Sequence, residues 1–122
     1  MGEKYLIDTN IIIDFSENKL SAEAKAFVAS VIDTEPFLSV INKIELLGFS
    51  DVSKTIVELV DTATVIGLTD AIIHRTIAIR KSKKIKLPDA IIAATALEHK
   101  LQVITRNIAD FQNIKGLKII NP

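Results

Sequence analysis

Three acidic residues of this 122-residue chain lie where a doubly wound α/β fold would gather them into one pocket: Asp8, Glu45 and Asp89. Asp8 ends an apolar run that begins at Tyr5, and Glu45 lies within a second apolar run. Asp89 follows Pro88 and precedes a third. Carboxylates among apolar neighbours are destabilising unless a partner neutralises them. Because Mg²⁺ and Mn²⁺ prefer oxygen ligands, the pattern predicts a divalent metal site.

Each of these acids alone also has a purely structural explanation. Asp8 stands where it would cap a following helix. Asp89 follows a first-turn proline, where an acid favours the helix dipole. Glu45 is the informative member, because it lies between Ile44 and Leu46 in a helix that we expect to bury most of its faces. Acids are rarely buried without a partner, so the three together favour a functional site.

Apolar runs of strand length alternate with longer helical patterns, and the connections between them are short. The expected strands are 5–8, 36–39, 64–66, 102–105 and 117–120. The expected helices are 9–15, 21–33, 39–47, a segment from 51 or 53 to 60, 69–81 and 88–97. Mostly apolar strands joined by helices are typical of a parallel sheet covered on both faces. We predict one domain over residues 1–122, a three-layer α/β/α sandwich with a central, mostly parallel sheet of about five strands.

The position of the acids along these elements agrees with that fold. Ligands of parallel α/β sheets bind at the carboxyl ends of the strands, at a topological switch point. Asp8 lies at such an end, and Asn107 and Asp110 follow the strand that ends at Thr105. We therefore expect these side chains to meet at one edge of the sheet.

Composition limits the classes of function. Hydrophobic residues make up 48% and charged residues 25%, as in a globular domain. The chain has no cysteine, which agrees with a cytoplasmic location. No apolar run is long enough to span a membrane, so we expect no membrane partner. The formal net charge is zero, so binding of a nucleic acid would depend on local charge or on a metal.

Four segments of the chain resemble the PIN domain, and they occur in the order of that family: 6–10, 44–45, 87–96 and 104–111. The chain looks most like the VapC-type toxins of bacterial and archaeal toxin–antitoxin pairs. The resemblance implies a Mg²⁺- or Mn²⁺-dependent ribonuclease in which Asp8, Glu45 and Asp89 match the three family acids. It also implies a cognate antitoxin as partner, and a homodimer, for which Phe15, Leu20 and Phe49 are candidate surface residues.

The fourth acidic position differs from the strictest family pattern. Asn107 stands where relatives often have Asp, and Asp110 is the other candidate for a fourth catalytic and metal-binding acid. Asn10 and Thr105 match polar positions that orient ligands or water in the family. Both also suit ordinary hydrogen bonding at a helix start and a strand end.

Cations cluster just before Asp89, with no acid among them. The candidates for contacts with RNA phosphates are Arg80, Lys81, Lys83, Lys84, Lys86 and, beside Asn107, Arg106. A solvated helix end, where cations favour the dipole, is the competing explanation.

Two other classes of protein share the alternating pattern. A phosphoacceptor receiver domain needs an acidic pair after the first strand and an acceptor Asp after a central strand, but this chain has Ser39 after its second strand. A PIN domain without catalysis would serve as a binding module, which intact Asp8, Glu45 and Asp89 argue against. Histidine chemistry is disfavoured because His74 and His99 have no metal-ligand spacing.

Overall fold

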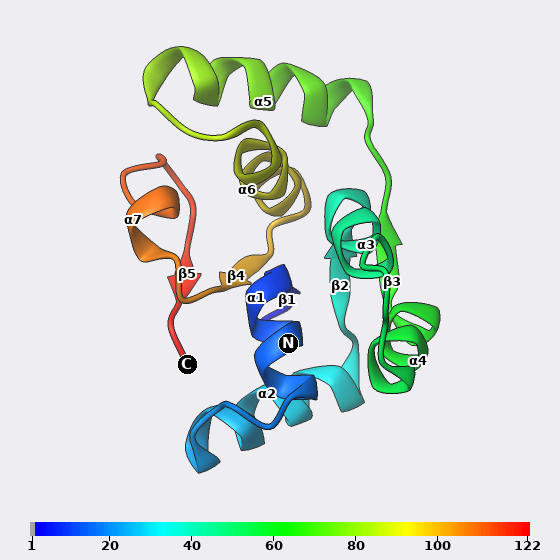
Figure 1. The fold of residues 1–122 in the computed structure, drawn as a ribbon. Helices are drawn as coiled ribbons and strands as arrows, with labels where there is room; N and C mark the ends of the chain where they lie inside the picture. The colour runs from blue at the N-terminus through cyan, green and yellow to red at the C-terminus, as the bar shows by residue number, and fades with distance from the viewer. Residues whose placement is uncertain (1) are drawn as a thin grey trace.

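Five short strands form one parallel sheet at the centre of the computed structural model, which describes residues 2–122 (Figure 1). The strands are β1 (Tyr5–Ile7), β2 (Phe37–Ser39), β3 (Thr64–Ile66), β4 (Gln102–Ile104) and β5 (Ile119–Ile120). Their order across the sheet is β3-β2-β1-β4-β5, and every neighbouring pair is parallel. The predicted fold class is confirmed.

Helices connect the strands and cover both faces of the sheet (Figure 1). They are α1 (Thr9–Ser16), α2 (Ala22–Thr34), α3 (Val40–Leu47), α4 (Lys54–Thr62), α5 (Asp70–Ser82), α6 (Leu87–His99) and α7 (Ile108–Phe111). The sequence did not indicate α7, because four residues are too few to show a helical period. It also predicted a last strand of twice the observed length. Among the helices of residues 2–122, none has the length and apolarity needed to cross a bilayer.

Side-chain caps fix where several helices begin. The side chains of Ser21, Ser39, Ser53 and Thr69 each accept a hydrogen bond from a backbone N–H in the first turn of the following helix. Such caps satisfy donors that the helix itself leaves unpaired. Helix α6 instead starts with Pro88 in its first turn, where the missing N–H is no loss.

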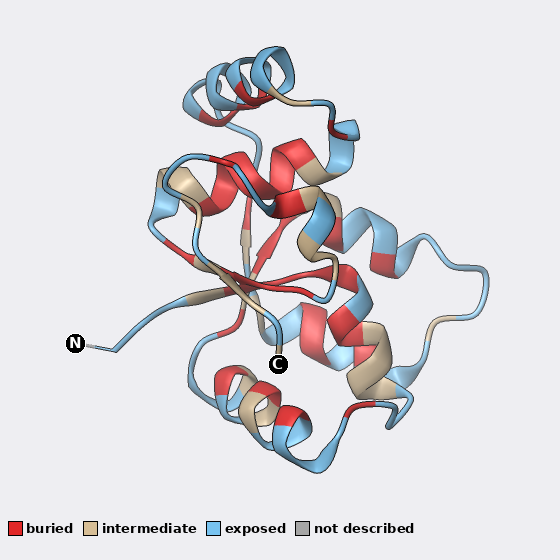
Figure 2. Ribbon diagram, turned by 90° about the vertical axis from the view of Figure 1, so that its left-hand side faces the viewer, coloured by how far each residue is buried: buried red, intermediate tan, exposed pale blue. Residues whose placement is uncertain are grey.

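The core is divided by the sheet into two apolar layers. Leu6 and Val103 point toward the α5–α6 side, whereas Ile7 and Ile104 point toward the α1, α2 and α4 side. This alternation is the two-residue period of a strand. Figure 2 shows burial concentrated in the central strands and in α6, which lies between the sheet and the outermost helix α5.

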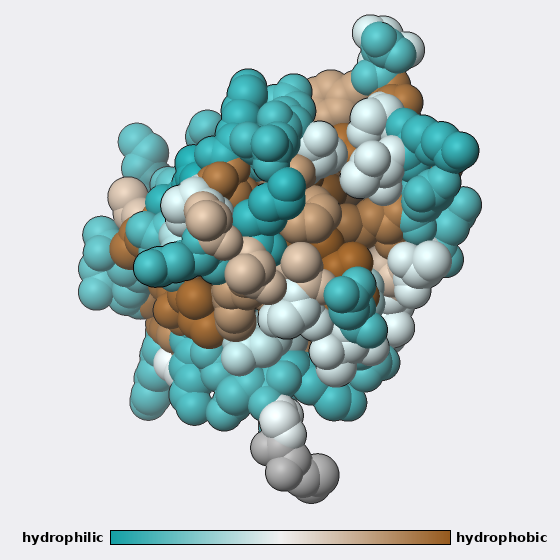
Figure 3. Space-filling model, turned by 90° about the horizontal axis from the view of Figure 1, so that it is seen from below, coloured by the Kyte–Doolittle hydropathy of each residue, from teal (hydrophilic) through white to brown (hydrophobic). Residues whose placement is uncertain are grey.

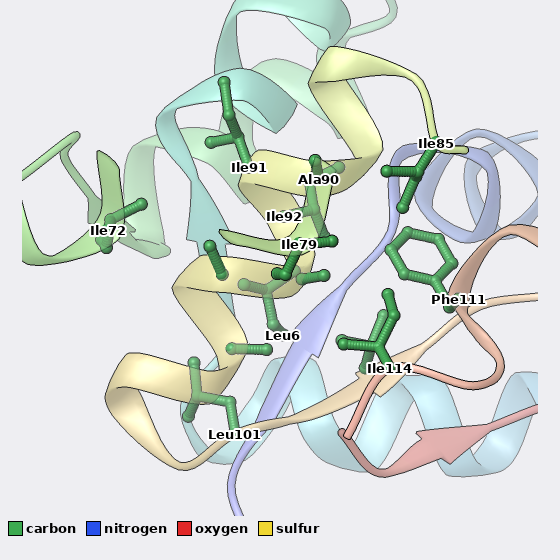
Figure 4. Packing of buried hydrophobic residues seen from close by; sticks show 14 of the residues in the cluster. Leu6, Ile72, Ile79, Ile85, Ala90, Ile91, Ile92, Leu101, Phe111 and Ile114 are labelled. Atoms are coloured by element: carbon green, nitrogen blue, oxygen red, sulfur yellow. The ribbon is translucent and has the colours of Figure 1, made fainter. Parts of the chain in front are cut away.

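The short helix α7 is anchored in the α5–α6 layer. Phe111 is fully buried, and Figure 4 shows its ring between Ile85 and Ile114, members of the same cluster. A buried aromatic side chain stabilises such a segment far more than the hydrogen bonds of a single turn do. This anchor determines the place of Asp110, the residue before Phe111.

Two expectations about apolar surface were wrong. Helix α3 was expected to bury most of its faces, but only Asn42 and Leu46 are buried, and Ile44 is 61% exposed. A short helix at the edge of the sheet contacts the core through one stripe only. Leu20, expected at the surface, is buried in the α1–α2–α4 layer. Phe49 is exposed, as expected.

The strand order creates a switch point between β1 and β4. From β1 the chain proceeds to β2 and β3 on one side, and then returns to place β4 and β5 on the other. Crossovers therefore leave β1 and β4 in opposite directions, which opens a crevice at their carboxyl ends. Asp8 follows β1 and Thr105 follows β4 directly.

Candidate active site

Asp8 lies at the carboxyl end of β1 and begins α1. Its Oδ1 accepts a hydrogen bond from the backbone N–H of Thr9 at 2.9 Å, and its Oδ2 accepts one from the Thr105 hydroxyl at 2.8 Å. The residue is only 5% exposed. Asp8 is thus the N-cap of α1, as the structural explanation predicted, and at the same time a buried carboxyl group whose two oxygens are both oriented.

The pKa values of Asp8 and Asp89 show that the acids share one electrostatic environment. Burial raises the pKa of Asp8 and the charges of Glu45 and Asp110 add to the rise, while the hydrogen bonds from Thr105 and Thr9 oppose it. Burial is also the main reason that the pKa of half-buried Asp89 is raised to about 6. The charges of Asp8, Asp110 and Glu45, and hydrogen bonding with the Asp110 carboxyl group, raise it further. Neighbouring carboxyl groups repel each other when they are ionised. Each therefore releases its proton less readily, and its pKa rises.

Glu45 lies near these acids because of a contact that the sequence did not predict. It was singled out as an acid buried in an apolar helix, but it is exposed and lies on the open side of α3. The Thr9 hydroxyl donates a hydrogen bond to its Oε1 at 2.8 Å, and this contact ties α3 to the start of α1. Glu45 therefore lies at the cleft, but as an exposed residue and not as the buried acid that its apolar neighbours suggested.

The two candidates for the fourth acidic position are bonded to each other, and of the two only Asn107 lines the cleft described below. The Asn107 side-chain amide donates to Oδ2 of Asp110. The backbone N–H of Asn107 donates to the Thr105 hydroxyl at 2.9 Å, so that hydroxyl bridges Asp8 and the turn before α7. Thr105 is fully buried, and its two hydrogen bonds join Asp8 to the turn before α7.

The acids open onto a cleft of ≈ 440 Å³ at the carboxyl edge of the sheet. Its walls are Asp8, Thr9, Asn10, Ile13, Ile44, Glu45, Gly48, Phe49, Asp89 and Asn107. Asn10 is exposed on this wall. The cleft has an apolar rim at Ile44 and Phe49, and its floor is polar.

Sequence reasoning missed two residues that connect the acids, Thr9 and Asn42. Thr9 contacts both Asp8 and Glu45, and buried Asn42 donates from Nδ2 to the Thr9 hydroxyl at 2.9 Å. A signal for Asn42 was present, because it lies three residues after Ser39 in the arrangement of a capping box. Nothing local in the sequence indicated its second contact, across to α1.

The chemistry of the donors fits a hard divalent cation. The cleft offers carboxylate and amide oxygens, and a cation would relieve the repulsion that raises the pKa of Asp89. Within residues 2–122, no three Asp, Glu, His or Cys side chains are close enough to enclose a metal ion. Mg²⁺ does not need such a cage, since it keeps several waters and binds through one or two carboxylates together with substrate phosphates. The open cleft fits that mode of binding.

Two of the basic candidates already bind other groups of the protein, and within residues 2–122 the other four do not form an ion pair. The Lys83 ammonium group donates to the carbonyl oxygens of Ala109 and Gln112, at 3.2 and 2.8 Å. Arg106 pairs with Asp14 at 3.2 Å. The other four candidates are exposed and form no ion pair within the described part of the chain: Arg80, Lys81, Lys84 and Lys86.

The fold and the cleft define a class before any relative is considered: a doubly wound α/β domain with clustered acids at its switch point. The family model of the PIN domain matches residues 5–117, and the chain belongs to the PIN-domain family. It is 27% identical to Ribonuclease VapC1 of Rickettsia felis, over 94% of this chain and 93% of the relative. The resemblance predicted from four short segments is confirmed.

Solved structures agree with this assignment. A toxin–antitoxin complex from Klebsiella pneumoniae contains a chain that is 36% identical, with a TM-score of 0.78 and 98% of each chain covered. FitAcB from Neisseria gonorrhoeae contains one that is 27% identical, with a TM-score of 0.73 and 97% of each chain covered. These relatives favour a nuclease over a receiver-like signalling module.

Proposed function

We propose that this PIN domain is a metal-dependent endoribonuclease and the toxin of a VapBC-type toxin–antitoxin pair. The observation that supports this most is the convergence of Asp8, Glu45 and Asp89 on one open cleft. Asp110 lies close enough for its charge to raise the pKa of Asp8 and of Asp89. The curated relative is named a ribonuclease, and the 36% identical chain comes from a toxin–antitoxin complex.

In this proposal Asp8, Glu45, Asp89 and Asp110 are the catalytic and metal-binding acids, and Mg²⁺ or Mn²⁺ is the cofactor. A bound divalent cation would lower the pKa of a water and stabilise the charge that develops on the phosphate. The chain's own groups hold the site in shape. Thr105 and Thr9 keep the Asp8 carboxyl group fixed, and Asn107 orients Asp110. Asn10 faces the cleft where a water or a phosphate would lie.

The exposed cations near α6 are the proposed contacts for RNA. Arg80, Lys81, Lys84 and Lys86 are free to bind phosphates, and they lie in the segment that leads to Asp89. Lys83 and Arg106 would contact RNA only by leaving their present partners, so we expect a smaller contribution from them. Each phosphate that a cation neutralises adds an increment of affinity that falls with salt.

The proposed protein partners are a cognate antitoxin and a second copy of the chain. Large apolar side chains are exposed on α3, α4, α5 and nearby turns, among them Phe49, Val57 and Ile77. Figure 3, which shows the side that carries α2, also has apolar areas between hydrophilic ones. Exposed apolar patches of this kind are typical of interfaces. A toxin that cleaves cellular RNA would act in the cytoplasm.

RNA cleavage in Mg²⁺ or Mn²⁺, with EDTA as the metal-free reference, tests the proposed function. Asp8→Asn should abolish cleavage and leave the fold intact, because the amide retains an acceptor oxygen and removes a buried charge. Asp61→Asn is the matched control, since Asp61 is exposed on α4 and does not line the cleft. Equal cleavage by wild type and Asp8→Asn, or cleavage unaffected by EDTA, would refute the proposal.

A further inference from the structure

A chain of three hydrogen bonds starts at the end of β2 and ends at Glu45. The backbone N–H of Ser39 donates to Oδ1 of Asn42 at 2.8 Å. Nδ2 of Asn42 donates to the Thr9 hydroxyl at 2.9 Å, and this hydroxyl donates to Oε1 of Glu45 at 2.8 Å. The chain therefore joins the ends of two neighbouring strands to an acid of the cleft.

The direction of this chain is fixed by chemistry at its first bond. A backbone N–H can only donate, so the Asn42 oxygen must face Ser39 and the Asn42 NH₂ group must face Thr9. A hydroxyl has a single proton. Because the Thr9 oxygen accepts from Asn42, its proton is directed to Glu45. The two ends of the amide are thus assigned by their partners.

Burial makes the arrangement rigid up to its last member. Asn42 is fully buried and Thr9 is only 8% exposed, so water has little access to either side chain. Within the described residues, no buried side-chain nitrogen or oxygen lacks a hydrogen bond. Glu45 itself is exposed and, without a partner, its long side chain would sample several rotamers. The only side-chain hydrogen bond to Glu45 within residues 2–122 is the one from Thr9.

Thr9 also connects Glu45 to Asp8. Its backbone N–H donates to Oδ1 of Asp8, while its side chain donates to Glu45. A single residue therefore sets the relative position of two acids on different helices. Asn42 holds Thr9 in the rotamer that makes this possible.

We propose that Asn42 is a positioning residue that acts through Thr9 to orient Glu45 toward the metal-binding face of the cleft. The inference rests on the proposed function of the site. The competing explanation is that Asn42 only completes the capping box with Ser39. The cap requires the side-chain oxygen alone, whereas the proposal requires the NH₂ group.

Asn42→Asp separates these two roles because it is isosteric. The oxygen that accepts from Ser39 remains, but the atom that faces Thr9 becomes an acceptor. The Thr9 hydroxyl would then donate to position 42 and release Glu45. Thr9→Val removes the hydroxyl without introducing a charge, and Thr9→Ser restores it.

Calorimetric titration with Mn²⁺, without RNA, measures the consequence. We expect Asn42→Asp and Thr9→Val to weaken Mn²⁺ binding by about tenfold or more, as is usual when a partner of a metal ligand is lost. Thr9→Ser should bind within about twofold of wild type, well inside the loss expected for a missing partner. Wild-type affinity in Thr9→Val would overturn the inference. If wild type binds no Mn²⁺ at all, the proposed function fails as well.

A double variant tests the direction of the chain without any metal. In Asn42→Asp combined with Glu45→Gln, the Thr9 hydroxyl would donate to position 42 and accept from the new amide at position 45, so the chain would run in reverse. We expect the double variant to melt at a higher temperature than Asn42→Asp alone. Relief of the repulsion between the new carboxylate at position 42 and Glu45 would let Asn42→Asp combined with Glu45→Ala recover as much, whereas the reversed chain predicts that the variant with Gln recovers more. Should Asn42→Asp fail to fold, refolding of the double variant would support the inference, and its failure to refold would count against it.

Discussion

Asp89→Asn should stabilise the metal-free protein at neutral pH and not at acidic pH. The folded state raises the pKa of Asp89 from 3.8 to about 6, because burial and the neighbouring acids disfavour its charge. The folded protein therefore holds this proton more tightly than the unfolded chain. The free energy of unfolding falls as the pH rises from about 4 to about 6, where only the unfolded chain has released the proton.

The size of the effect follows from the shift. At about 1.4 kcal/mol per pKa unit the full shift corresponds to roughly 3 kcal/mol. Asp89 is only half-buried, so solvent screening should reduce this to about 1–2 kcal/mol. For a domain of this size, a change of 1 kcal/mol moves the melting temperature by about 4 °C. We therefore expect Asp89→Asn to melt about 4–8 °C above wild type in EDTA at neutral pH.

Thermal melts in EDTA, followed by circular dichroism between about pH 3.5 and pH 7.5, measure this difference. The advantage of the variant should appear as the pH rises through the window from 3.8 to about 6 and stay constant above it. Asp70→Asn is the matched control, since Asp70 lies in the first turn of α5 as Asp89 does in α6, but Asp70 is exposed. A difference between wild type and Asp89→Asn that does not depend on pH would refute the electrostatic reasoning.

Four further predictions concern the metal, the cations and assembly. Millimolar Mg²⁺ should raise the melting temperature of wild type but not of Asp8→Asn, because it binds only the folded site; equal shifts would place the metal elsewhere. Replacing Lys84 and Lys86 by Gln should weaken RNA binding in Ca²⁺ and flatten its dependence on salt, with the single-turnover rate at saturating RNA unchanged. Lys83→Gln should instead lower stability by about 1 kcal/mol, because two carbonyl groups lose a charged donor. If Lys83→Gln flattened the salt dependence of RNA binding as much as the loss of Lys84 or Lys86, this distinction would be wrong. Light scattering at tens of micromolar should give the mass of two chains, and a strictly monomeric mass would exclude the homodimer.

The parts of the fold that the sequence predicted are those determined by local patterns. Apolar runs with helix caps between them located four strands and six helices closely, and the position of Asp8 followed from its place after β1. Helix α7 has no period of its own and depends on burial of Phe111, a tertiary contact. The shortness of β5 likewise reflects where the sheet ends.

The candidate site was predictable residue by residue but not bond by bond. Asp8 and Asn107 reach the cleft that their positions after strands indicated, and Asp89 reaches it from the first turn of α6. The contact between Thr9 and Glu45 depends on how α1 and α3 align, which no local pattern encodes. The same holds for Lys83, whose charge suggested RNA but whose ammonium group lies against the end of α7.

The surroundings of Asp8 and Asp89 explain why Asp89 is the better position at which to test electrostatics in the metal-free protein. At Asp8, two hydrogen-bond donors partly oppose the effect of burial, although its pKa is still raised on balance. At Asp89, every resolved influence on the pKa acts in the same direction. A group held this way gains most when a positive charge arrives. Asp8 caps α1 whether or not a metal is bound, whereas every resolved influence on Asp89 disfavours its charge. A cation bound in the cleft would therefore affect Asp89 most, and its raised pKa agrees with the proposed metal site.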